Sequence, residues 1–365
     1  MPSTIAVLGA NGFVGSRLLE VFHIGQLATL RPVVRRYCSL AGLARFDLDW
    51  RIAEGCEINA LTAAFRGCDA VVNLIAADPS VIVRNATICY QAAQAAGVKR
   101  LVFMSSASVH GQAPSPGTDE TSPLHTNHVF AYNNAKVLAE QDLIKLRRRG
   151  SVELVILRPG IVFGPRSRWV SNIANQLLSN TAYLINGDQG VCNSIYVDNL
   201  IEAIRLALIV PAADRDVFLV GDRERITWMQ FYAQIASALG VDIQLVPWLE
   251  APQFEHGAIE QLQRLRASRA VQALLSIVPS TLKQTVKAAL SAATAPPRSS
   301  PWALPITPGP YVTQEFAALH QCSVQLPWTK AASILGYQPM VSFAEGMERS
   351  LGWLAFAGYP VRRQT

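Results

Sequence analysis

The sequence predicts an α/β protein in which a doubly wound parallel sheet is followed by a smaller, mixed C-terminal lobe. Short apolar runs that suit buried strands alternate with stretches of helical periodicity, and this rhythm is typical of parallel sheets covered by helices. The first apolar run leads directly into a glycine-rich turn and a helix. Half of the 365 residues are hydrophobic and 16% are charged, so the chain can bury a sizeable core.

The glycine-rich turn occupies residues 9–15, between an apolar strand at residues 5–8 and the start of a helix. Its glycines allow a tight turn and a close approach of the backbone to a pyrophosphate, which the first N–H groups of the helix would bind. The spacing is G-x-x-G-x-x-G rather than G-x-G-x-x-G, so an ordinary glycine-rich turn is the alternative. As a dinucleotide site, the turn predicts a Rossmann-like domain. The expected cofactor contacts in it are Gly9, Asn11, Gly12, Phe13, Val14 and Gly15.

The second predicted strand, Ala28 to Val34, ends in Arg35 and Arg36. In a dinucleotide-binding sheet the residue that closes this strand faces the adenine ribose. An acidic residue there favours the 2′-hydroxyl of NAD, whereas an arginine favours the 2′-phosphate of NADP. Arg31, Arg35 and Arg36 are present and the strand has no acidic residue, so the sequence favours NADP, with NAD or a merely solvated basic turn as alternatives.

The following elements continue the alternation as far as residue 150. The fourth strand closes on Ala76 and Ala77, small residues that let the backbone approach a cofactor. A glycine, Gly97, is the expected stop of the helix that follows it. The predicted strands are Trp50–Ala53, Ala70–Ile75 and Arg100–Met104, and the predicted helices are Ile58–Phe65, Val81–Ala96 and the stretch from Ala131 to Gly150.

Residues able to move a proton lie near the end of the fifth strand. Residues 105–111 follow this strand directly, at the edge of the sheet where ligands bind in such folds. Tyr132 and Lys136 are four apart and project from the same side of their helix. A free tyrosine has a pKa of about 10, and an ammonium one turn away is expected to lower that pKa. We therefore expect Tyr132 to be an acid/base for a proton transfer that accompanies hydride transfer.

Taken together, these motifs resemble the extended short-chain dehydrogenases/reductases, a group that holds sugar-nucleotide epimerases, dehydratases and 3β-hydroxysteroid-type dehydrogenases. The resemblance covers roughly residues 4–210, and Lys330–Ala332 with Leu335–Pro339 fit the closing pattern of the family. The matching pieces are the glycine turn, residues 73–77, Asn85, residues 105–111, Tyr132-x-x-x-Lys136, Leu157–Pro165 and Ile195–Asn199.

The resemblance implies roles for individual residues. Ser106 would bind the substrate oxygen, with Ser108 as a second contact, and Asn85 would support Lys136 through a water molecule. Lys136 would also bind the nicotinamide ribose. The other implied cofactor contacts are Leu74, Ala76 and Pro159.

Two departures from the family pattern narrow the reaction. Ala107 and Ser108 stand where dehydratases carry Asp-Glu, so dehydration is not expected. Cys192 and Asn193 stand where sugar-nucleotide enzymes usually carry an arginine for the diphosphate, although Arg166 and Arg168 could substitute.

The leading hypothesis is an NADPH-dependent oxidoreductase that reduces a ketone on a bulky substrate such as a 3-oxo sphingolipid or a sterol. A sugar-nucleotide epimerase or reductase is the alternative, and a non-catalytic dinucleotide sensor is the third. The intact Tyr132/Lys136 pair ranks the sensor last, because sensors commonly lack it.

We expect residues 1–165 to form the dinucleotide-binding core, with segments near 190–222 returning to it, and residues 166–365 to form the substrate lobe. Residues 217–220 suit a strand that rejoins the sheet, and Thr227 opens a helix that reaches Leu239. The family pattern is lost between about 254 and 325. There, residues 262–293 predict basic amphipathic helices that either lie on an anionic membrane or pack as ordinary core, and residues 296–310 predict a proline-rich extended loop.

Composition excludes several other classes. The six cysteines have no C-x-x-C spacing and the histidines no H-E-x-x-H pattern, so we expect reduced thiols, a cytoplasmic location and no metal. The net charge of +6 is not accompanied by a nucleic-acid-binding motif, so we expect no nucleic-acid partner. The first strand begins at about residue 4, so no signal peptide is expected. The family resemblance implies a homodimer. If the basic helices lie on a membrane rather than pack as core, they would place the protein peripherally on the inner membrane face.

Overall fold

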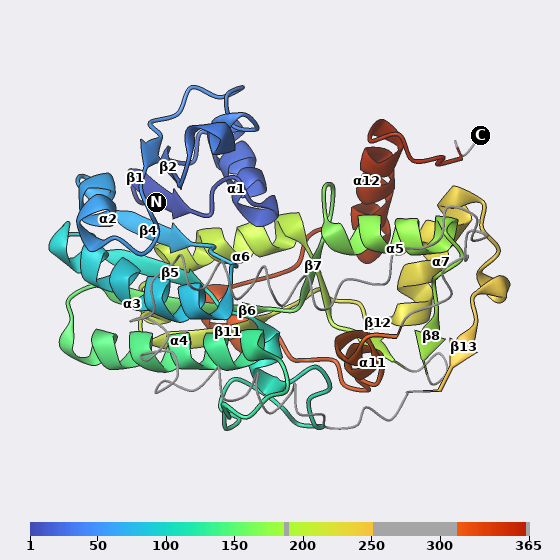
Figure 1. Cartoon of the computed structure of the whole chain (residues 1–365). Coiled ribbons are helices and arrows are strands. Elements are labelled where there is room, and N and C mark those ends of the chain that lie inside the picture. Colours follow the sequence, from blue (N-terminus) through green and yellow to red (C-terminus); the bar gives the residue numbers. More distant parts are fainter. Residues whose placement is uncertain (186–189, 251–311, 363–365) are drawn as a thin grey trace, which may run out of the picture.

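The computed structural model describes residues 1–185, 190–250 and 312–362 (Figure 1). In this part of the chain seven strands form a central sheet, in the order β11-β6-β5-β4-β1-β2-β3, with every pairing parallel. The predicted doubly wound parallel sheet is thereby confirmed. The strand order reverses between β1 and β4, which creates the crevice where ligands bind in such sheets. The strands are β1 (Thr4–Leu8), β2 (Thr29–Val34), β3 (Arg51–Ile52), β4 (Ala70–Asn73), β5 (Arg100–Met104), β6 (Glu153–Pro159) and β11 (Asp216–Val220).

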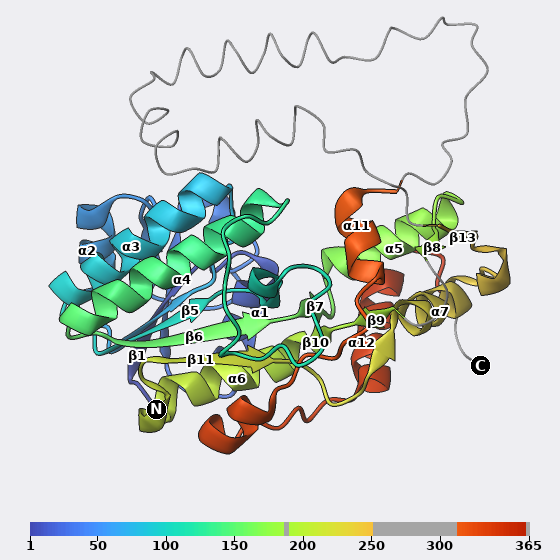
Figure 2. The same cartoon turned by 90° about the horizontal axis from the view of Figure 1, so that it is seen from below.

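Helices cover both faces of this sheet (Figure 2). One face is buried by Leu18, Leu19 and Phe22 and by their neighbours from a second helix; the other is buried by small and aliphatic residues of three helices. Because both faces are covered, the central strands β4 and β5 are buried along their whole length and are apolar except for Asn73 and Arg100 at their ends. The first face carries α1 (Phe13–Ile24) and α6 (Val197–Ile209), and the second carries α2 (Ile58–Phe65), α3 (Pro79–Ala95) and α4 (Ala131–Arg149).

Most predicted elements lie within two residues of the observed ones, and the fourth strand shows why one boundary differs. The strand ends at Asn73 rather than Ile75. The Asn73 side chain accepts a hydrogen bond from the Ile75 backbone N–H at 3.1 Å and donates to Asn85 Oδ1 at 2.8 Å. The asparagine therefore turns the chain out of the sheet two residues earlier than the apolar pattern indicates.

The second lobe combines three small two-stranded sheets with four helices in the described residues (Figure 1). Its core is aromatic: the Phe163 ring lies 5.5 Å from the rings of Tyr196, Phe231 and Phe343. The strands are β7 (Ile161–Phe163), β8 (Leu184–Ile185), β9 (Val191–Cys192), β10 (Ser194–Tyr196), β12 (Ile226–Thr227) and β13 (Trp248–Leu249). The helices are α5 (Arg168–Leu178), α7 (Trp228–Leu239), α11 (Gln314–His320) and α12 (Phe343–Phe356).

The chain passes between the two lobes more than once. After β10 it returns to the sheet through α6 and β11, and then enters the second lobe again at β12. Helix α11 was not predicted from the sequence; Thr313 caps it by accepting a hydrogen bond from the Phe316 N–H. The predicted amphipathic helices at 262–293 and the loop at 296–310 lie outside the described residues. Among the helices that are described, none has the length and apolar character needed to cross a membrane.

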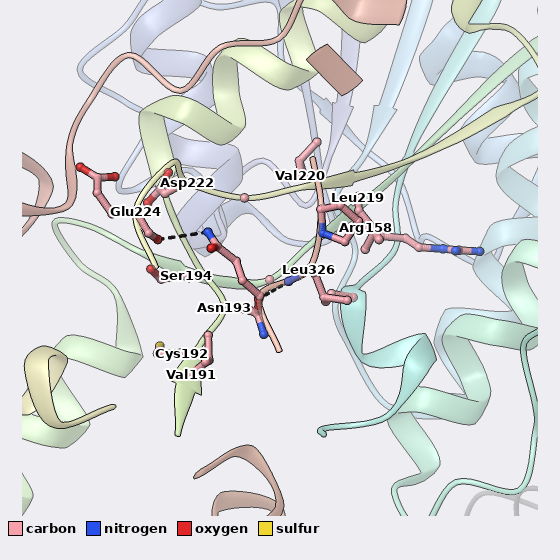
Figure 3. Close-up of a pocket in the computed structure, with 15 residues that line it drawn as sticks. Arg158, Val191, Cys192, Asn193, Ser194, Leu219, Val220, Asp222, Glu224 and Leu326 are labelled. Carbon is pink, nitrogen blue, oxygen red and sulfur yellow. Dashed lines mark hydrogen bonds between the residues drawn. The ribbon is translucent and has the colours of Figure 1, made fainter. Parts of the chain in front are cut away.

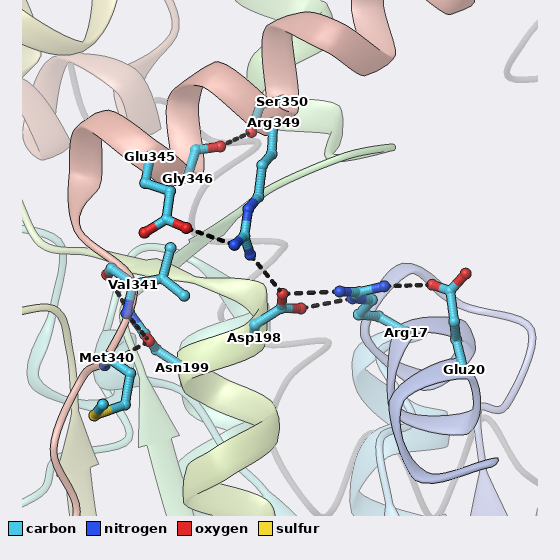
Figure 4. Close-up of polar contacts among 10 residues, drawn as sticks. All are labelled: Arg17, Glu20, Asp198, Asn199, Met340, Val341, Glu345, Gly346, Arg349 and Ser350. Atoms are coloured by element: carbon cyan, nitrogen blue, oxygen red, sulfur yellow. Dashed lines mark hydrogen bonds and ion pairs between the residues drawn. The ribbon is translucent and has the colours of Figure 1, made fainter. Parts of the chain in front are cut away.

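An ion network ties three helices together (Figure 4). Asp198, near the start of α6, receives two hydrogen bonds from Arg17 of α1, at 2.6 and 2.8 Å. Its Oδ2 also lies 3.3 Å from the Arg349 guanidinium of α12. The adjacent Asn199 accepts hydrogen bonds from the backbone of residues 340 and 341. The glycine-turn helix and the C-terminal helix therefore share one carboxylate.

Candidate active site

The glycine turn between β1 and α1 has the geometry that a bound pyrophosphate requires. Gly9 has a φ of 76°, and its carbonyl accepts a hydrogen bond from the Gly12 N–H at 3.0 Å. A Cβ on Gly15 would lie 2.2 Å from the Gly9 oxygen, so only glycine fits there. Gly12 is the exposed N-cap of α1, and as a glycine it places no side chain over the N–H groups of the first turn. These residues suit the phosphates of a dinucleotide.

The backbone beside this turn brings β1 and β4 together. Leu74 donates its backbone N–H to the Leu8 carbonyl, and its own carbonyl lies 3.0 Å from where a Cβ of Gly9 would be. Ala76 follows, exposed. Pro159, also expected to contact the cofactor, is buried at the end of β6.

The arginines at the end of β2 divide into two groups. The sequence suggested that Arg31 is available to a cofactor, but in the structure it is engaged elsewhere. It pairs with Asp49 at 2.7 Å and donates to the carbonyls of Ala64 and Arg66. Arg35 and Arg36 are exposed at the carboxyl end of the strand.

Ser106, Ser108 and Tyr132 meet at the carboxyl end of β5. Ser106 is the second residue after β5, and its Oγ accepts hydrogen bonds from the Ser108 N–H at 3.2 Å and the Ser108 hydroxyl at 2.9 Å. Burial raises the pKa of Tyr132 to about 12, and a hydrogen bond with Ser106 acts in the opposite direction on this pKa. The structure thus places the predicted serine beside the predicted tyrosine.

Lys136 is not among the groups that shift the pKa of Tyr132. Its buried Nζ donates to the carbonyls of Met104 at 2.7 Å and Ile75 at 3.4 Å, and lies 5.7 Å from the centre of the Tyr132 ring. Burial lowers the pKa of Lys136 to about 8. The expectation that this ammonium holds the pKa of Tyr132 below 10 is wrong in this structure, because burial of the phenol dominates. Tyr132 is therefore protonated at neutral pH and suited to donate a proton.

Asn85 is part of the frame around the site. Its Oδ1 accepts a hydrogen bond from Asn73 at 2.8 Å and its Nδ2 donates to the Gly55 carbonyl at 2.5 Å. These bonds join α3 to the ends of β3 and β4. A link from Asn85 to Lys136 through water stays a prediction.

A buried cluster that sequence reasoning missed fixes the helix that carries Tyr132. Glu140 forms an ion pair with Arg158 of β6, with Oε2 2.6 Å from Nη2, and also bonds the Ser105 hydroxyl. Both charged side chains are at most 3% exposed. Arg158 also lies 3.1 Å from the His110 ring, whose pKa falls to about 4 through burial and this guanidinium. A signal existed: Glu140 follows Lys136 by four residues on an apolar helix face.

Glu315 of α11 was also missed, and it approaches Tyr132 from the second lobe. Its Oε1 accepts a hydrogen bond from Gln112 at 3.3 Å, and the Gln112 oxygen accepts one from Asn133, the neighbour of Tyr132, at 2.6 Å. The Glu315 charge contributes to the raised pKa of Tyr132. Because Glu315 lies 183 residues beyond Tyr132 in a stretch without a family motif, no pattern could indicate it.

Beyond this centre, a pocket extends toward the second lobe between β6, β9, β10 and β11 (Figure 3). Asn193 lies in its wall, accepting a hydrogen bond from the Leu326 N–H at 2.8 Å and donating to the Val324 carbonyl at 2.9 Å. Cys192 is buried. Acidic residues line the pocket as well: burial raises the pKa of Asp222 to about 7, and Glu224 lies nearby. Within the described chain, no three His, Cys, Asp or Glu side chains are arranged to hold a metal ion.

The two arginines predicted to bind the substrate, Arg166 and Arg168, point to different places in the structure. Arg168 is the exposed first residue of α5. Arg166 turns away from the pocket toward α1, where its Nη1 donates to Ser16 Oγ at 3.3 Å.

The parallel sheet, the glycine turn and the Ser106–Tyr132–Lys136 group define a Rossmann-type oxidoreductase that uses a nicotinamide dinucleotide. The family profile described as "NAD dependent epimerase/dehydratase family" matches residues 5–221. The chain belongs to this family, within the extended short-chain dehydrogenases/reductases.

Individual relatives point to more than one substrate class. UDP-glucose 4-epimerase of Vibrio cholerae is 29% identical over 66% of this chain and 76% of its own. The 3β-hydroxysteroid-dehydrogenase/decarboxylase isoform 1 of Arabidopsis thaliana is 22% identical over 94% of this chain and 78% of its own. Among solved structures, the dTDP-glucose 4,6-dehydratase DesIV of Streptomyces venezuelae with NAD bound superposes with a TM-score of 0.69 at 18% identity, covering 97% of both chains. That likeness supports the fold.

Proposed function

We propose that the protein transfers a hydride between NADP(H) and a ketone or secondary alcohol on a bulky substrate that carries no nucleotide diphosphate. The observation that supports this proposal most is that Cys192 and Asn193 stand where sugar-nucleotide enzymes usually carry an arginine for the diphosphate. Cys192 is buried, and Asn193 uses both ends of its amide to hold residues 322–326. Glu224 in the same pocket and Glu315 near Tyr132 are acidic, so a diphosphate on the substrate would meet like charge there.

Each residue of the centre then has a defined task. When bound, a nicotinamide dinucleotide would supply the hydride for the carbonyl carbon. Tyr132 donates its phenolic proton to the carbonyl oxygen, and its raised pKa keeps that proton in place at neutral pH. The Ser106 hydroxyl binds the same oxygen and orients it. Lys136 donates to the carbonyls of Met104 and Ile75 and has one N–H donor left, which would hold the nicotinamide ribose.

Two further observations support the cofactor and substrate classes. The exposed Arg35 and Arg36 at the end of β2 favour the 2′-phosphate of NADP. Relatives named as sterol dehydrogenases include the Arabidopsis protein above and the sterol-4-alpha-carboxylate 3-dehydrogenase of Candida albicans, which is 26% identical over 226 residues. We therefore favour a sterol or another 3-oxo lipid as the substrate.

A sugar-nucleotide epimerase is the second candidate, favoured by the 29% identity to the Vibrio cholerae enzyme. An epimerase returns the hydride to its own substrate and keeps NAD bound, whereas a reductase releases the oxidised cofactor. Purified protein that is saturated with NAD and insensitive to NADPH would support this candidate.

The experiment is a turnover screen with NADPH and NADH against 3-oxo sterols, 3-oxo sphingolipids and UDP-, GDP- and dTDP-sugars. We expect turnover of a keto-lipid with NADPH. Tyr132→Phe should lower kcat by at least about 100-fold, and the control Tyr359→Phe, near the C-terminus, should keep it. Turnover confined to sugar nucleotides, or an active Tyr132→Phe variant, would overturn the proposal.

A further inference from the structure

Arg166 occupies a backbone conformation that sets the direction in which its side chain leaves the main chain. It lies in the loop between β7 and α5 with a φ of 75°, a left-handed conformation that non-glycine residues seldom adopt. The loop around it is held firmly. Ser167 donates its N–H to the Gly164 carbonyl at 3.0 Å, while its hydroxyl donates to the Val162 carbonyl and caps α5. These bonds hold the backbone on either side of Arg166, whose side chain is exposed.

The guanidinium crosses from the second lobe to the dinucleotide-binding lobe. Nη1 donates to Ser16 Oγ at 3.3 Å, and Nη2 lies 4.0 Å from the position of a Cβ on Gly42. Ser16 is one turn into α1, where its N–H bonds the Gly12 carbonyl at 2.9 Å. Gly42 belongs to the segment that follows β2. The cation thus lies between the start of the glycine-turn helix and the segment beyond Arg35 and Arg36.

Among the residues that the structure describes, Arg166 has no acidic partner. By contrast, Arg17 pairs with Asp198 and Glu20, and Arg45 with Glu20. The first turn of α1 has no acidic residue either. The start of a helix carries a partial positive charge, so an added cation is unfavourable there unless an anion lies between them. A dinucleotide phosphate on the glycine turn is such an anion.

We propose that Arg166 is a phosphate ligand of the dinucleotide, supplied by the second lobe, rather than a ligand of the substrate. This inference rests on the cofactor site of the proposed function. The group it binds is a phosphate ester of the cofactor: the pyrophosphate, which NAD and NADP share, or the 2′-phosphate, which only NADP has. An arginine from the second lobe would also couple cofactor binding to the relative position of the two lobes.

Equilibrium binding of NADPH and NADH, followed by tryptophan fluorescence on nucleotide-free protein, tests this inference. Arg166→Gly removes the guanidinium and suits the left-handed backbone, and Arg166→Lys retains the charge. Arg168→Ala, two residues away and exposed, is the matched control. We expect Arg166→Gly to weaken binding about 10- to 100-fold, Arg166→Lys to weaken it less, and Arg168→Ala to stay within about twofold.

The two nucleotides identify the phosphate. An equal loss for NADPH and NADH assigns the pyrophosphate, and a loss for NADPH alone assigns the 2′-phosphate. A folded Arg166→Gly variant with unchanged Kd for both nucleotides overturns the inference. If the KM for the substrate rises while both Kd values stay unchanged, Arg166 is a substrate ligand instead. Wild-type protein that binds neither nucleotide overturns the proposed function and the inference together.

Discussion

At the scale of single residues, the site buries charged side chains whose burial lowers the stability of the folded protein. Lys136 is 1% exposed and its Nζ is bonded to two carbonyls. The carboxylate one turn further along, Glu140, is already engaged by Arg158. Burying an ammonium with incomplete compensation lowers stability, and the depressed pKa of Lys136 reflects that cost.

Lys136→Met should therefore yield a more stable and inactive protein. With a folded pKa of about 8 against an ordinary 10.5, the unfolded state binds more protons between these values, so wild-type stability should rise with pH across that window. The full free-energy cost of burying the Lys136 ammonium, about 3 kcal/mol at most, is present below pH 8. Urea unfolding at pH 7 should show a gain of about 1–3 kcal/mol for the variant. A variant less stable than wild type would contradict this.

Glu315→Gln should shift the pH dependence of turnover. The Glu315 carboxylate helps to raise the pKa of Tyr132, so its removal should move the alkaline limb of the kcat/KM profile to lower pH. Glu315 is exposed, so the shift should be less than about one pH unit and should shrink in high salt. Glu348→Gln, on the exposed face of α12, is the control. Identical profiles for both variants at low salt would remove Glu315 from the site.

At the scale of elements, α11 is held by an unusual anchor. His320 is buried at its C-terminal end and stacks on Trp228, with ring centres 4.7 Å apart and planes inclined by 19°. Neither ring nitrogen has a hydrogen-bond partner among the described residues. Burial lowers the pKa of His320 to about 3, so the ring stays neutral in the folded protein.

This anchor should make the wild-type protein sensitive to acid. The unfolded state binds a proton at His320 near pH 6.5 but the folded state only near pH 3, so this histidine costs stability progressively as pH falls between these values. His320→Phe keeps an aromatic ring without the titration. Urea unfolding at pH 7 and pH 4.5 should show a smaller loss of stability for the variant than for wild type. An equal loss in both proteins would contradict the assignment.

The elements also show what a sequence can and cannot predict. Strand β5 and helix α2 lie at the predicted residues because apolar runs bounded by turn residues specify local structure. Tyr132 and Lys136 could be predicted because their spacing along one helix is local, and Ser106 because the family resemblance implies its role. The high proton affinity of Tyr132, the approach of Glu315 and the direction of Arg166 depend on burial and on contacts between distant segments, which spacing does not encode.

At the scale of the whole molecule, Asp198 links the two lobes. It is 17% exposed, and its two cations belong to α1 and α12, which lie far apart in sequence (Figure 4). Such a partly buried carboxylate with a two-point contact to an arginine is worth more than an ordinary surface pair.

Asp198→Asn should destabilise the protein by about 1–2 kcal/mol, because two guanidinium groups lose their shared counter-ion. The matched control is Glu202→Gln on the same helix, which breaks the more exposed pair with Arg205 and should cost at most about 0.5 kcal/mol. Thermal unfolding of both variants followed by circular dichroism measures the difference. Equal effects would mean that the bridge between helices adds nothing beyond a surface pair.

The shared counter-ion has a consequence for protein engineering. A chimera that joined the first 221 residues to the C-terminal lobe of another family member would bring an unrelated helix to Asp198, and Arg17 would be left to hold that carboxylate alone. Helices α1, α6 and α12 should therefore be transferred together in a chimera, although they belong to different parts of the chain. A recombination experiment that seeks new substrate specificity should take all three from one parent, or restore an arginine at the position of Arg349.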